Sequence, residues 1–166
     1  MSIVNELIQR YGLEPHPEGG WYKQIYKSNE QIAADSLPER FKGDRAFSTA
    51  IYFLLEHGNF SAFHRIKSDE CWHFYAGGPL LIYVIEQTGE LKVISLGSDH
   101  EKGQLFQYVV PANCWFASRP ALGSEYCFVG CTVSPGFEFD DLELADVTEL
   151  SAIYPQHRSI IIELCR

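Results

Sequence analysis

Two side chains that suit proton transfer, His64 and Glu70, stand close together in a β-rich part of the sequence. An imidazole titrates near neutral pH, and a neighbouring carboxylate can orient it, so the pair fits general acid–base chemistry. His64 ends an apolar segment, Asp69 lies in a turn, and Glu70 begins the return, so we expect a hairpin that brings both side chains to one face. The carboxylate favours the imidazolium and burial opposes it, which leaves the direction of the pKa shift of His64 open.

Several further polar side chains are candidates for the wall of the same pocket. Tyr52, on a strand expected over 47–55, is a candidate second acid in catalysis. Arg45 and Lys67 offer cations to an anionic ligand. Gln107 can orient a ligand through its amide, or it can cap a neighbouring backbone group.

The aromatic side chains of Trp72, Phe74 and Phe116 have two interpretations. They are typical core residues, and a ligand pocket can also use such side chains as stacking platforms. His16 and Glu18 lie in a Pro-His-Pro-Glu-Gly-Gly loop, whose prolines and glycines forbid regular structure and predict a shaped turn. Both simple turn chemistry, with Glu18 capping backbone amides, and a role in ligand binding fit this loop.

Short β-rich segments separated by turn residues must position these side chains. Ser2 can cap a short helix with apolar residues at helical spacing, and Gly12 suits the position just past its end. Strands are expected over 21–26, 47–55, 62–66, 70–75, 80–86, 91–96, 106–110, 114–118 and 126–133. Residues 142–153 are weakly helical, and 160–164 form a last strand or helix.

Many short strands without intervening helical patterns indicate an all-β sandwich or barrel rather than a parallel α/β sheet. The 166 residues suffice for one well-buried core and are few for two, so we expect a single domain over 1–166. A hydrophobic content of 46% excludes disorder as the main state.

Charge and cysteine content limit which classes of partner the protein can bind and which compartment it occupies. Thirteen Lys and Arg against 22 Asp and Glu give a net charge of -9, which repels nucleic acid and anionic membrane surfaces. No apolar run approaches the roughly 20 residues that span a bilayer. Five cysteines without CxxC pairs, and no recognisable leader segment, predict a cytoplasmic protein that binds neither nucleic acid nor membrane.

The spacing around His64 resembles the first sequence motif of the cupin superfamily. That motif is a glycine, His-x-His, a glutamate and a second glycine, in that order. Gly58, His64, Glu70 and Gly77 match it, whereas Ile66 stands where the second histidine belongs.

A second cupin motif, Pro-x-Gly followed by a histidine, resembles the stretch from Pro111, with Phe116 at the histidine position. The stretches PHPEGGWY, STAIYFLL, FHRIKSDECWHFYAGGPL, VVPANCWFAS and VGCTVSPGFEFDDLELA are similar to the small family often called cupin 5. The resemblance covers His16 to about Ala145. It implies a double-stranded β-helix, or cupin jelly-roll barrel, over about 16–145, with a helix over 1–12 and a minor C-terminal helical segment. It implies no established reaction.

The superfamily resemblance also raises the question of a metal. In cupins the histidines of both motifs and the glutamate of the first hold a transition metal. Ile66 and Phe116 put apolar atoms at two of these positions, so we expect no metal and no cofactor. If a metal were bound, its ligands would be His64, Glu70 and His73. Strand alternation puts His73 on the face opposite Glu70, and only a β-bulge would bring it back.

Two functions of different kinds fit these residues. The first is a metal-independent sugar or nucleotide-sugar epimerase or isomerase that uses His64 and Glu70, by analogy with metal-free cupins that have a histidine base. The second is a non-catalytic module that binds or senses a small molecule in the barrel. A metal-dependent cupin dioxygenase or isomerase is disfavoured by Ile66 and Phe116.

The strand expected over 21–26 predicts the oligomeric state. It would leave an exposed aromatic edge, so we expect a homodimer. The strand can pair within its own barrel or exchange into the partner's, and the sequence leaves both arrangements open.

Overall fold

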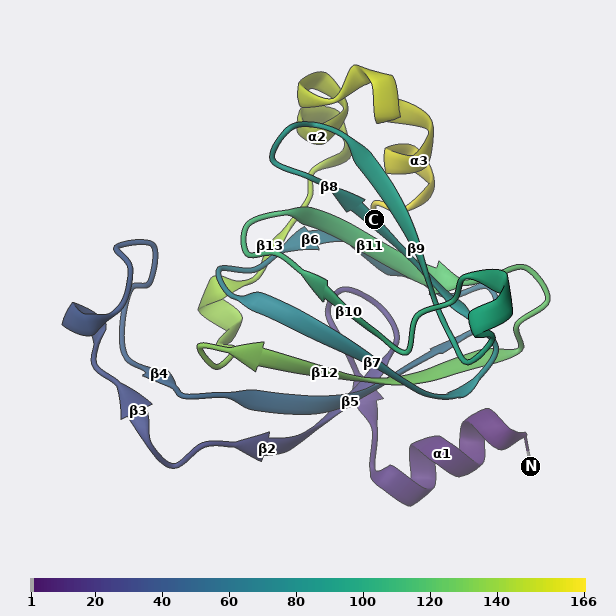
Figure 1. Ribbon diagram of the computed structural model, residues 1–166, viewed down its shortest axis with the longest axis horizontal. Coiled ribbons are helices and arrows are strands. Elements are labelled where there is room, and N and C mark those ends of the chain that lie inside the picture. The colour runs from purple at the N-terminus through teal and green to yellow at the C-terminus, as the bar shows by residue number, and fades with distance from the viewer. Residues whose placement is uncertain (1) are drawn as a thin grey trace.

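Two antiparallel sheets lie face to face and hold the core between them (Figure 1). The computed structural model describes residues 2–166. The larger sheet has the spatial order β1 (Glu14–Pro15), β2 (Trp21–Lys27), β5 (Thr49–Glu56), β12 (Tyr126–Ser134), β7 (Asp69–Gly77) and β10 (Gln107–Val110). The smaller sheet has the order β13 (Glu143–Leu144), β6 (Ser61–Arg65), β11 (Trp115–Pro120), β8 (Leu80–Ile85) and β9 (Leu91–Leu96). These sheets confirm the predicted all-β jelly roll, although they do not join into one closed hydrogen-bonded cylinder.

Strand alternation builds the central core. Phe53 of β5, Val129 of β12 and Ile82 of β8 belong to one buried cluster between the sheets. Every second side chain of a strand points to the same face, so the apolar positions of these strands meet across the sandwich. Complete burial of each such side chain contributes about 1.5–3 kcal/mol to folding.

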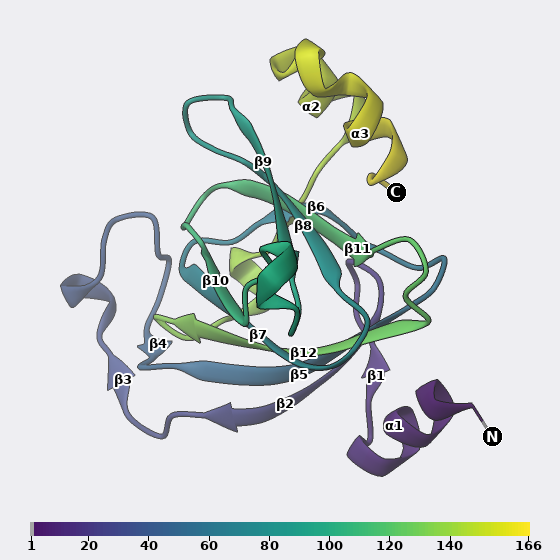
Figure 2. The same cartoon turned by 45° about the vertical axis from the view of Figure 1, so that its right-hand side comes forward.

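Helices cover the outer faces of both sheets (Figure 2). The predicted N-terminal helix is confirmed as α1 (Ile3–Tyr11), which packs on the larger sheet through Val4 and is capped by Ser2, with Gly12 left-handed at its end. The helices α2 (Val147–Ile153) and α3 (Arg158–Glu163) cover the smaller sheet. Residues 160–163 of the predicted last segment are helical, and Leu164 follows the helix end; Ile161 and Leu164, three residues apart, both reach the outer face of that sheet.

None of the helices within residues 2–166 combines the length and apolar character that crossing a membrane requires.

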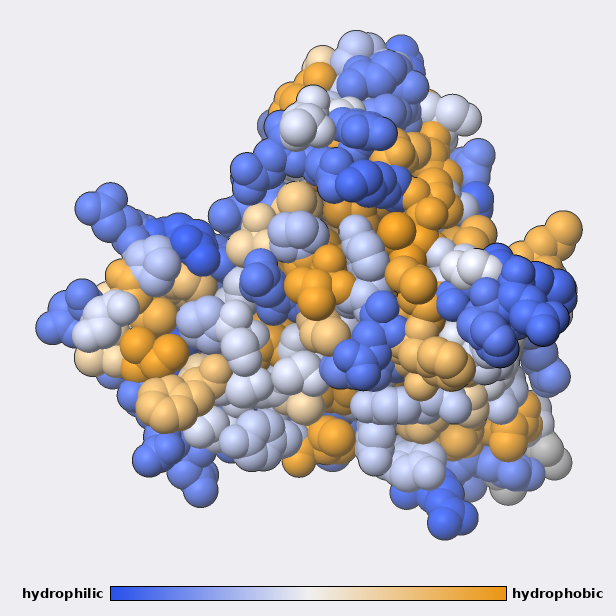
Figure 3. All heavy atoms as spheres, in the orientation of Figure 1, coloured by the Kyte–Doolittle hydropathy of each residue, from blue (hydrophilic) through white to orange (hydrophobic). Residues whose placement is uncertain are grey.

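Short elements complete the fold. Two further strands, β3 (Gln31–Ile32) and β4 (Arg45–Ala46), form an arm at the left of Figure 1. Single 3₁₀ turns occupy Ala34–Ser36, His100–Lys102, Phe139–Asp141 and Pro155–His157. On the face shown in Figure 3, hydrophobic side chains gather near β9 and β10, the edge strands of the two sheets. Large exposed apolar residues of these strands and their connection are Val93, Leu105, Phe106 and Val109.

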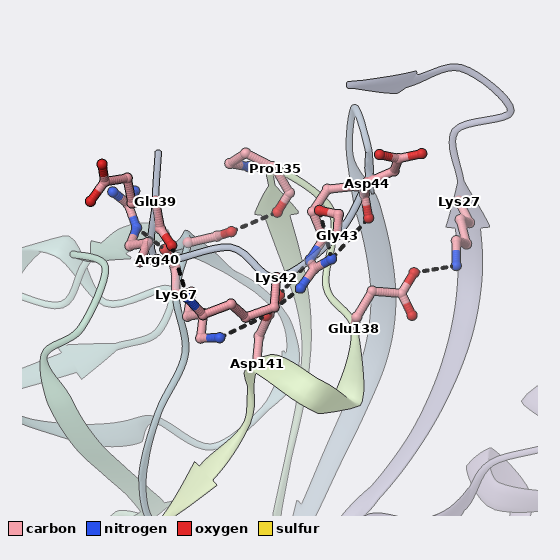
Figure 4. A network of polar contacts seen from close by, with 12 residues as sticks. Lys27, Glu39, Arg40, Lys42, Gly43, Asp44, Lys67, Pro135, Glu138 and Asp141 are labelled. Atoms are coloured by element: carbon pink, nitrogen blue, oxygen red, sulfur yellow. Dashed lines mark hydrogen bonds and ion pairs between the residues drawn. The ribbon is translucent and has the colours of Figure 1, made fainter. Parts of the chain in front are cut away.

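A buried ion pair ties this arm to the segment after β12 (Figure 4). Nε of Arg45 donates to Oδ2 of Asp141 at 2.8 Å, and Nη2 donates to Oδ1 at 2.6 Å. The two side chains are only 5% and 2% exposed. The remaining guanidinium nitrogen donates to the carbonyls of Gly43 and Asp44. Bidentate geometry of this kind suits a desolvated pair, because both carboxylate oxygens are satisfied.

We expect Asp141→Ala to lower the free energy of unfolding by roughly 3 kcal/mol. The substitution leaves the guanidinium of Arg45 buried without its carboxylate, and breaking a buried pair from one side is costly. Urea unfolding monitored by tryptophan fluorescence measures the change.

The matched control is Glu143→Ala, which breaks the solvent-exposed pair between Arg65 and Glu143. That pair has the same bidentate form, but water screens it, so its loss should cost less than about 1 kcal/mol. The double variant Arg45→Met/Asp141→Leu should recover most of the lost stability. Equal losses for Asp141→Ala and Glu143→Ala would contradict the buried-pair interpretation.

Candidate functional site

A cavity of about 240 Å³ opens between the sheets beside the Pro-Gly loop. Its walls come from this loop, the inner faces of both sheets, and the segment that follows β12. The lining residues are Glu14, His16, Glu18, Tyr22, Lys23, Gln24, Thr49, Ile51, His64, Ile66, Glu70, Cys131, Val133, Phe137 and Phe139. His64, Glu70, His16 and Glu18, all selected from the sequence, therefore line one cavity.

His64 and Glu70 reach this cavity from opposite sheets. His64 lies on β6 of the smaller sheet, and Glu70 lies on β7 of the larger one. The predicted hairpin is wrong: β6 pairs with β11 and β13, whereas β7 pairs with β12 and β10. The short connection between β6 and β7 crosses the sandwich, so the two side chains face each other across the core instead of sharing one face of a ribbon.

Both ring nitrogens of His64 are engaged. Nδ1 lies 2.7 Å from the carbonyl oxygen of Ala62, and Nε2 lies 2.9 Å from Oε2 of Glu18. A carbonyl can only accept, so Nδ1 carries a proton and Nε2 shares one with Glu18. Burial disfavours the charged ring, but the Glu18 charge and hydrogen bond, helped by Glu70 and the Ala62 carbonyl, raise the pKa of His64 overall.

Glu18 is the carboxylate that orients His64, a role the sequence suggested for Glu70. Burial works against ionisation of Glu18, yet the charge and the hydrogen bond of His64 lower its pKa overall. The backbone amide of Ala62 donates to the carbonyl of Glu18 at 2.8 Å, which fixes the loop against β6. The residue after Glu18 must be glycine. Gly19 has a φ of 110°, and a Cβ there would collide with the Phe60 carbonyl.

His16 is the second imidazole of the cavity. The backbone amide of Glu18 donates to its Nδ1 at 3.3 Å, so this nitrogen is an acceptor and the ring is neutral. Burial, the largest effect, lowers the pKa of His16, in agreement with that state. The 3.6 Å approach of Nδ1 to Oε2 of Glu18 is therefore a close contact rather than a hydrogen bond.

Glu70 is a buried carboxyl with an unused oxygen. It is only 8% exposed, and its Oε2 has no hydrogen-bond partner within residues 2–166. Burial and the negative charge of Glu18 raise the pKa of Glu70 to about 7, although His64 acts in the opposite direction. The nearby thiol of Cys131 stays protonated, because burial and Glu70 raise its pKa well above the usual value. Glu70 can thus donate or accept a proton near neutral pH.

The aromatic candidates form the core beneath the cavity. The ring of Phe116 lies 4.1 Å from that of His64, and the ring of Trp72 lies 6.1 Å from that of Phe116. Phe74 packs against the same cluster. None of the three lines the cavity: Phe116 covers the ring of His64, and Trp72 and Phe74 belong to the core around Phe116.

Tyr52 and Gln107 lie on the outer face of the larger sheet, outside the cavity. Tyr52 contacts Tyr11 of α1 and Phe128, with ring centroids 5.1 Å and 5.3 Å away. Gln107 is exposed and pairs with His73 across the ladder. In β5 the neighbours of Tyr52, Ile51 and Phe53, point inward, so alternation turns Tyr52 outward.

Arg45 and Lys67 do not line the cavity, and both approach Asp141. Figure 4 shows Lys67 beside Asp141. Lys67 Nζ lies 3.6 Å from Oδ1 of Asp141. Neither cation is therefore available to an anion in the cavity. Lys23 is the one lysine or arginine among the residues that line the cavity in the described chain.

The donor set does not fit a transition metal. Ile66 lines the cavity and Phe116 packs on His64, so hydrocarbon occupies the positions of two cupin ligands. His73 is turned away and its Nε2 lies 3.0 Å from the hydroxyl of Thr132 on the outer face. Within residues 2–166 no group of three or more His, Cys, Asp or Glu side chains is arranged to hold a metal ion.

Several lining residues were not selected from the sequence. Phe137 and Phe139 stand at the mouth, in the VGCTVSPGFEFDDLELA stretch, and Cys131 lies in the floor. The alternation of β12 carried a signal for Cys131, because Cys127, Val129 and Cys131 recur at every second position. The two phenylalanines follow a strand end, where no periodicity marks their direction.

Solved structures of similar proteins have the same fold. A hypothetical protein from Leishmania major is 32% identical, covers 97% of each chain and superposes with a TM-score of 0.88. A protein from Shewanella oneidensis is 40% identical over 100% of this chain and 99% of its own, with a TM-score of 0.89. Oxalate decarboxylase from Bacillus subtilis, at 12% identity and a TM-score of 0.55, shares the fold over 90% of this chain and 36% of its own.

Sequence comparison agrees. An uncharacterised protein of Saccharomyces cerevisiae is 27% identical in an alignment of 149 residues that covers 84% of this chain and 74% of the yeast protein. The profile of the cupin 5 family, described as cupin superfamily (DUF985), matches residues 5–145. The chain therefore belongs to the cupin 5 family of the cupin superfamily.

Proposed function

We propose that this protein is a metal-independent isomerase or epimerase that moves a proton on a small polar metabolite. The observation that carries the proposal is the pair of carboxyl groups, Glu18 and Glu70, that line one cavity with pKa values shifted in opposite directions. Environments that separate the pKa values of two neighbouring groups are typical of acid–base pairs in active sites.

The proposal gives each group a role. Glu70 populates both protonation states near pH 7, so it exchanges a proton directly with the substrate. His64 and Glu18 hold one proton between Nε2 and Oε2 and serve as the second proton-transfer unit. A proton taken from one position of the substrate is returned to another position or face, so the reaction needs no oxidant.

The size of the cavity limits the substrate. Drug-sized ligands occupy pockets of about 300–1,000 Å³, and this cavity measures about 240 Å³. A group of the size of one sugar ring fits this limit. In a nucleotide sugar, the nucleotide would have to remain outside the mouth.

A non-catalytic metabolite-binding or sensing module is the second candidate. The supporting observation is that both nitrogens of His64 are already engaged, by Ala62 and Glu18. In this alternative the His64–Glu18 pair only fixes the loop, and Glu70 only binds the ligand.

Replacing His64 separates these two functions. If the site is catalytic, His64→Asn should slow proton exchange on a metabolite that is identified by mass spectrometry in the purified protein by about 10²–10⁴-fold, the usual effect of losing a general acid or base. The rate is measured by NMR in D₂O as loss of the exchanging C–H signal. His73→Asn, on the outer face, is the matched control and should leave the rate unchanged. Weaker binding of that metabolite by His64→Asn, with no exchange in either protein, would support the binding module instead.

The ionisation of Glu70 should appear in the pH dependence of stability. An acid whose pKa rises from 4.5 to about 7 on folding stabilises the protein below pH 4.5 and loses that contribution as the pH rises through 7. Glu70→Gln removes this loss. Relative to the wild type, the variant should gain roughly 2–3 kcal/mol between pH 4.5 and pH 8.

Urea unfolding at several pH values measures this gain, with exposed Glu101→Gln as the control for removing a surface carboxylate. A wild-type minus Glu70→Gln difference that stays constant across the window would show that Glu70 is ionised throughout.

We further propose that the chain forms a homodimer through the outer edge of β2. Within residues 2–166, β1 pairs with β2 only at Trp21 and Tyr22, which leaves the edge beyond them open. Ile25 and Tyr26 on this edge are half exposed. An open strand edge with apolar side chains favours pairing with another strand.

Sedimentation equilibrium at micromolar concentration should therefore give the mass of a dimer. Tyr26→Lys should shift the distribution toward monomer, because it puts a positive charge on the proposed interface of both subunits, where like charges repel. Val93→Lys, on the exposed edge strand of the smaller sheet, is the control. A wild type that is monomeric at every concentration would contradict the proposal.

A further inference from the structure

We propose that the cavity selects an uncharged ligand with a single sugar-like ring, and that the apolar face of this ring stacks on Phe139. The inference rests on the proposed function, because it names the substrate class of the same cavity. It follows from the aromatic mouth, the distribution of charge, and the position of the unused polar groups.

The mouth of the cavity is aromatic. Phe139 packs edge-on against Phe137 with centroids 5.1 Å apart, and its ring lies 5.9 Å from that of His16 and 6.4 Å from that of Tyr22. Phe139 nevertheless remains 50% exposed. Because Phe139 also lines the cavity, the exposed part of its ring is available to pack against the C–H face of a ligand ring.

The backbone segment that carries Phe139 is anchored on both sides. It begins the 3₁₀ turn Phe139–Asp141, and that turn ends at the carboxylate bound by Arg45. On its other side, the carboxylate of Glu138 pairs with Lys27 of β2, as Figure 4 shows. Contacts before and after Phe139 thus anchor its backbone, so this segment loses less freedom when a ligand binds.

The charges around the cavity disfavour an anion. Glu14, Glu18 and Glu70 line it, and Arg45 and Lys67 are held outside by Asp141. Lys23, the one lysine or arginine that lines the cavity in the described chain, is exposed to water, so a phosphate or carboxylate inside would meet carboxyl groups without a buried cation to bind it. The charge of Glu18 is already paired with His64, and Glu14 is exposed to water that screens it, so a ligand cation finds no unpaired buried charge while Glu70 is protonated.

The polar groups suit hydroxyls. Oε2 of Glu70 is buried without a partner in the described chain, and it can donate to or accept from a hydroxyl. Thr49, His16 and Gln24 add polar groups at other points of the wall, while Ile51, Ile66 and Val133 are apolar. A sugar ring has this same division between hydroxyl edges and a C–H face.

The test uses saturation-transfer NMR at pH 7 with a fixed set of probes. The uncharged probes are D-glucose, D-galactose, D-mannose, L-rhamnose and L-fucose. The charged probes are glucuronate, glucose 6-phosphate and glucosamine. We expect binding by at least one uncharged sugar and weaker or no binding by the charged probes.

The variant Phe139→Ala should weaken binding of that sugar by about 3- to 10-fold, the range of an aromatic contact, and Phe139→Trp should preserve it. Phe106→Ala is the matched control, because Phe106 is 55% exposed and does not line the cavity. Circular dichroism verifies that each variant is folded. Equal effects of Phe139→Ala and Phe106→Ala would overturn the stacking role.

The same samples in D₂O separate this inference from the proposed function. Sugar binding without C–H exchange would keep the inference and refute the isomerase. Tighter binding of a charged probe, or no binding by any probe, would overturn the inference, while the pH dependence of Glu70→Gln would still report on the proton-transfer group independently.

Discussion

The hydrogen bond between Glu18 and His64 is the interaction on which the rest of the site depends. It joins the Pro-Gly loop to the smaller sheet, and it makes two buried charges tolerable by pairing them. The charge of Glu18 also helps to keep Glu70 protonated on the facing sheet. One ion pair thus holds the loop in place and sets the ionisation of the carboxyl across the cavity.

A second buried pair, Arg45 with Asp141, supports the opposite wall. It fixes the turn that carries Phe139, so the cavity lies between two segments that each depend on one desolvated ion pair. The apolar core around both ion pairs strengthens the attraction between their charges, because little water is present to screen them. Burial of these two ion pairs therefore matters both for the chemistry of the site and for the packing of the fold.

Much of the fold and the centre of the site could be predicted from the sequence. The N-terminal helix follows from its cap and its periodicity, and the strands follow from alternation between turn residues. His64, Glu70, His16 and Glu18 were selected by residue type and spacing, and all four line one cavity. The outward direction of His73 follows from alternation relative to Glu70.

The partners of these groups were decided by the tertiary structure. Alternation relates side chains within one strand, but it does not say which sheet a strand joins, so the predicted hairpin of His64 and Glu70 became a pair of facing strands. For the same reason, alternation alone did not show that Tyr52 lies on the outer face of its sheet, outside the cavity. Arg45 meets Asp141, and Glu18 meets His64, only after distant segments pack together. Sequence by itself determined which chemical groups this protein has, because residue type is local; tertiary contact decided which of them interact, because burial and charge pairing depend on neighbours distant in the chain.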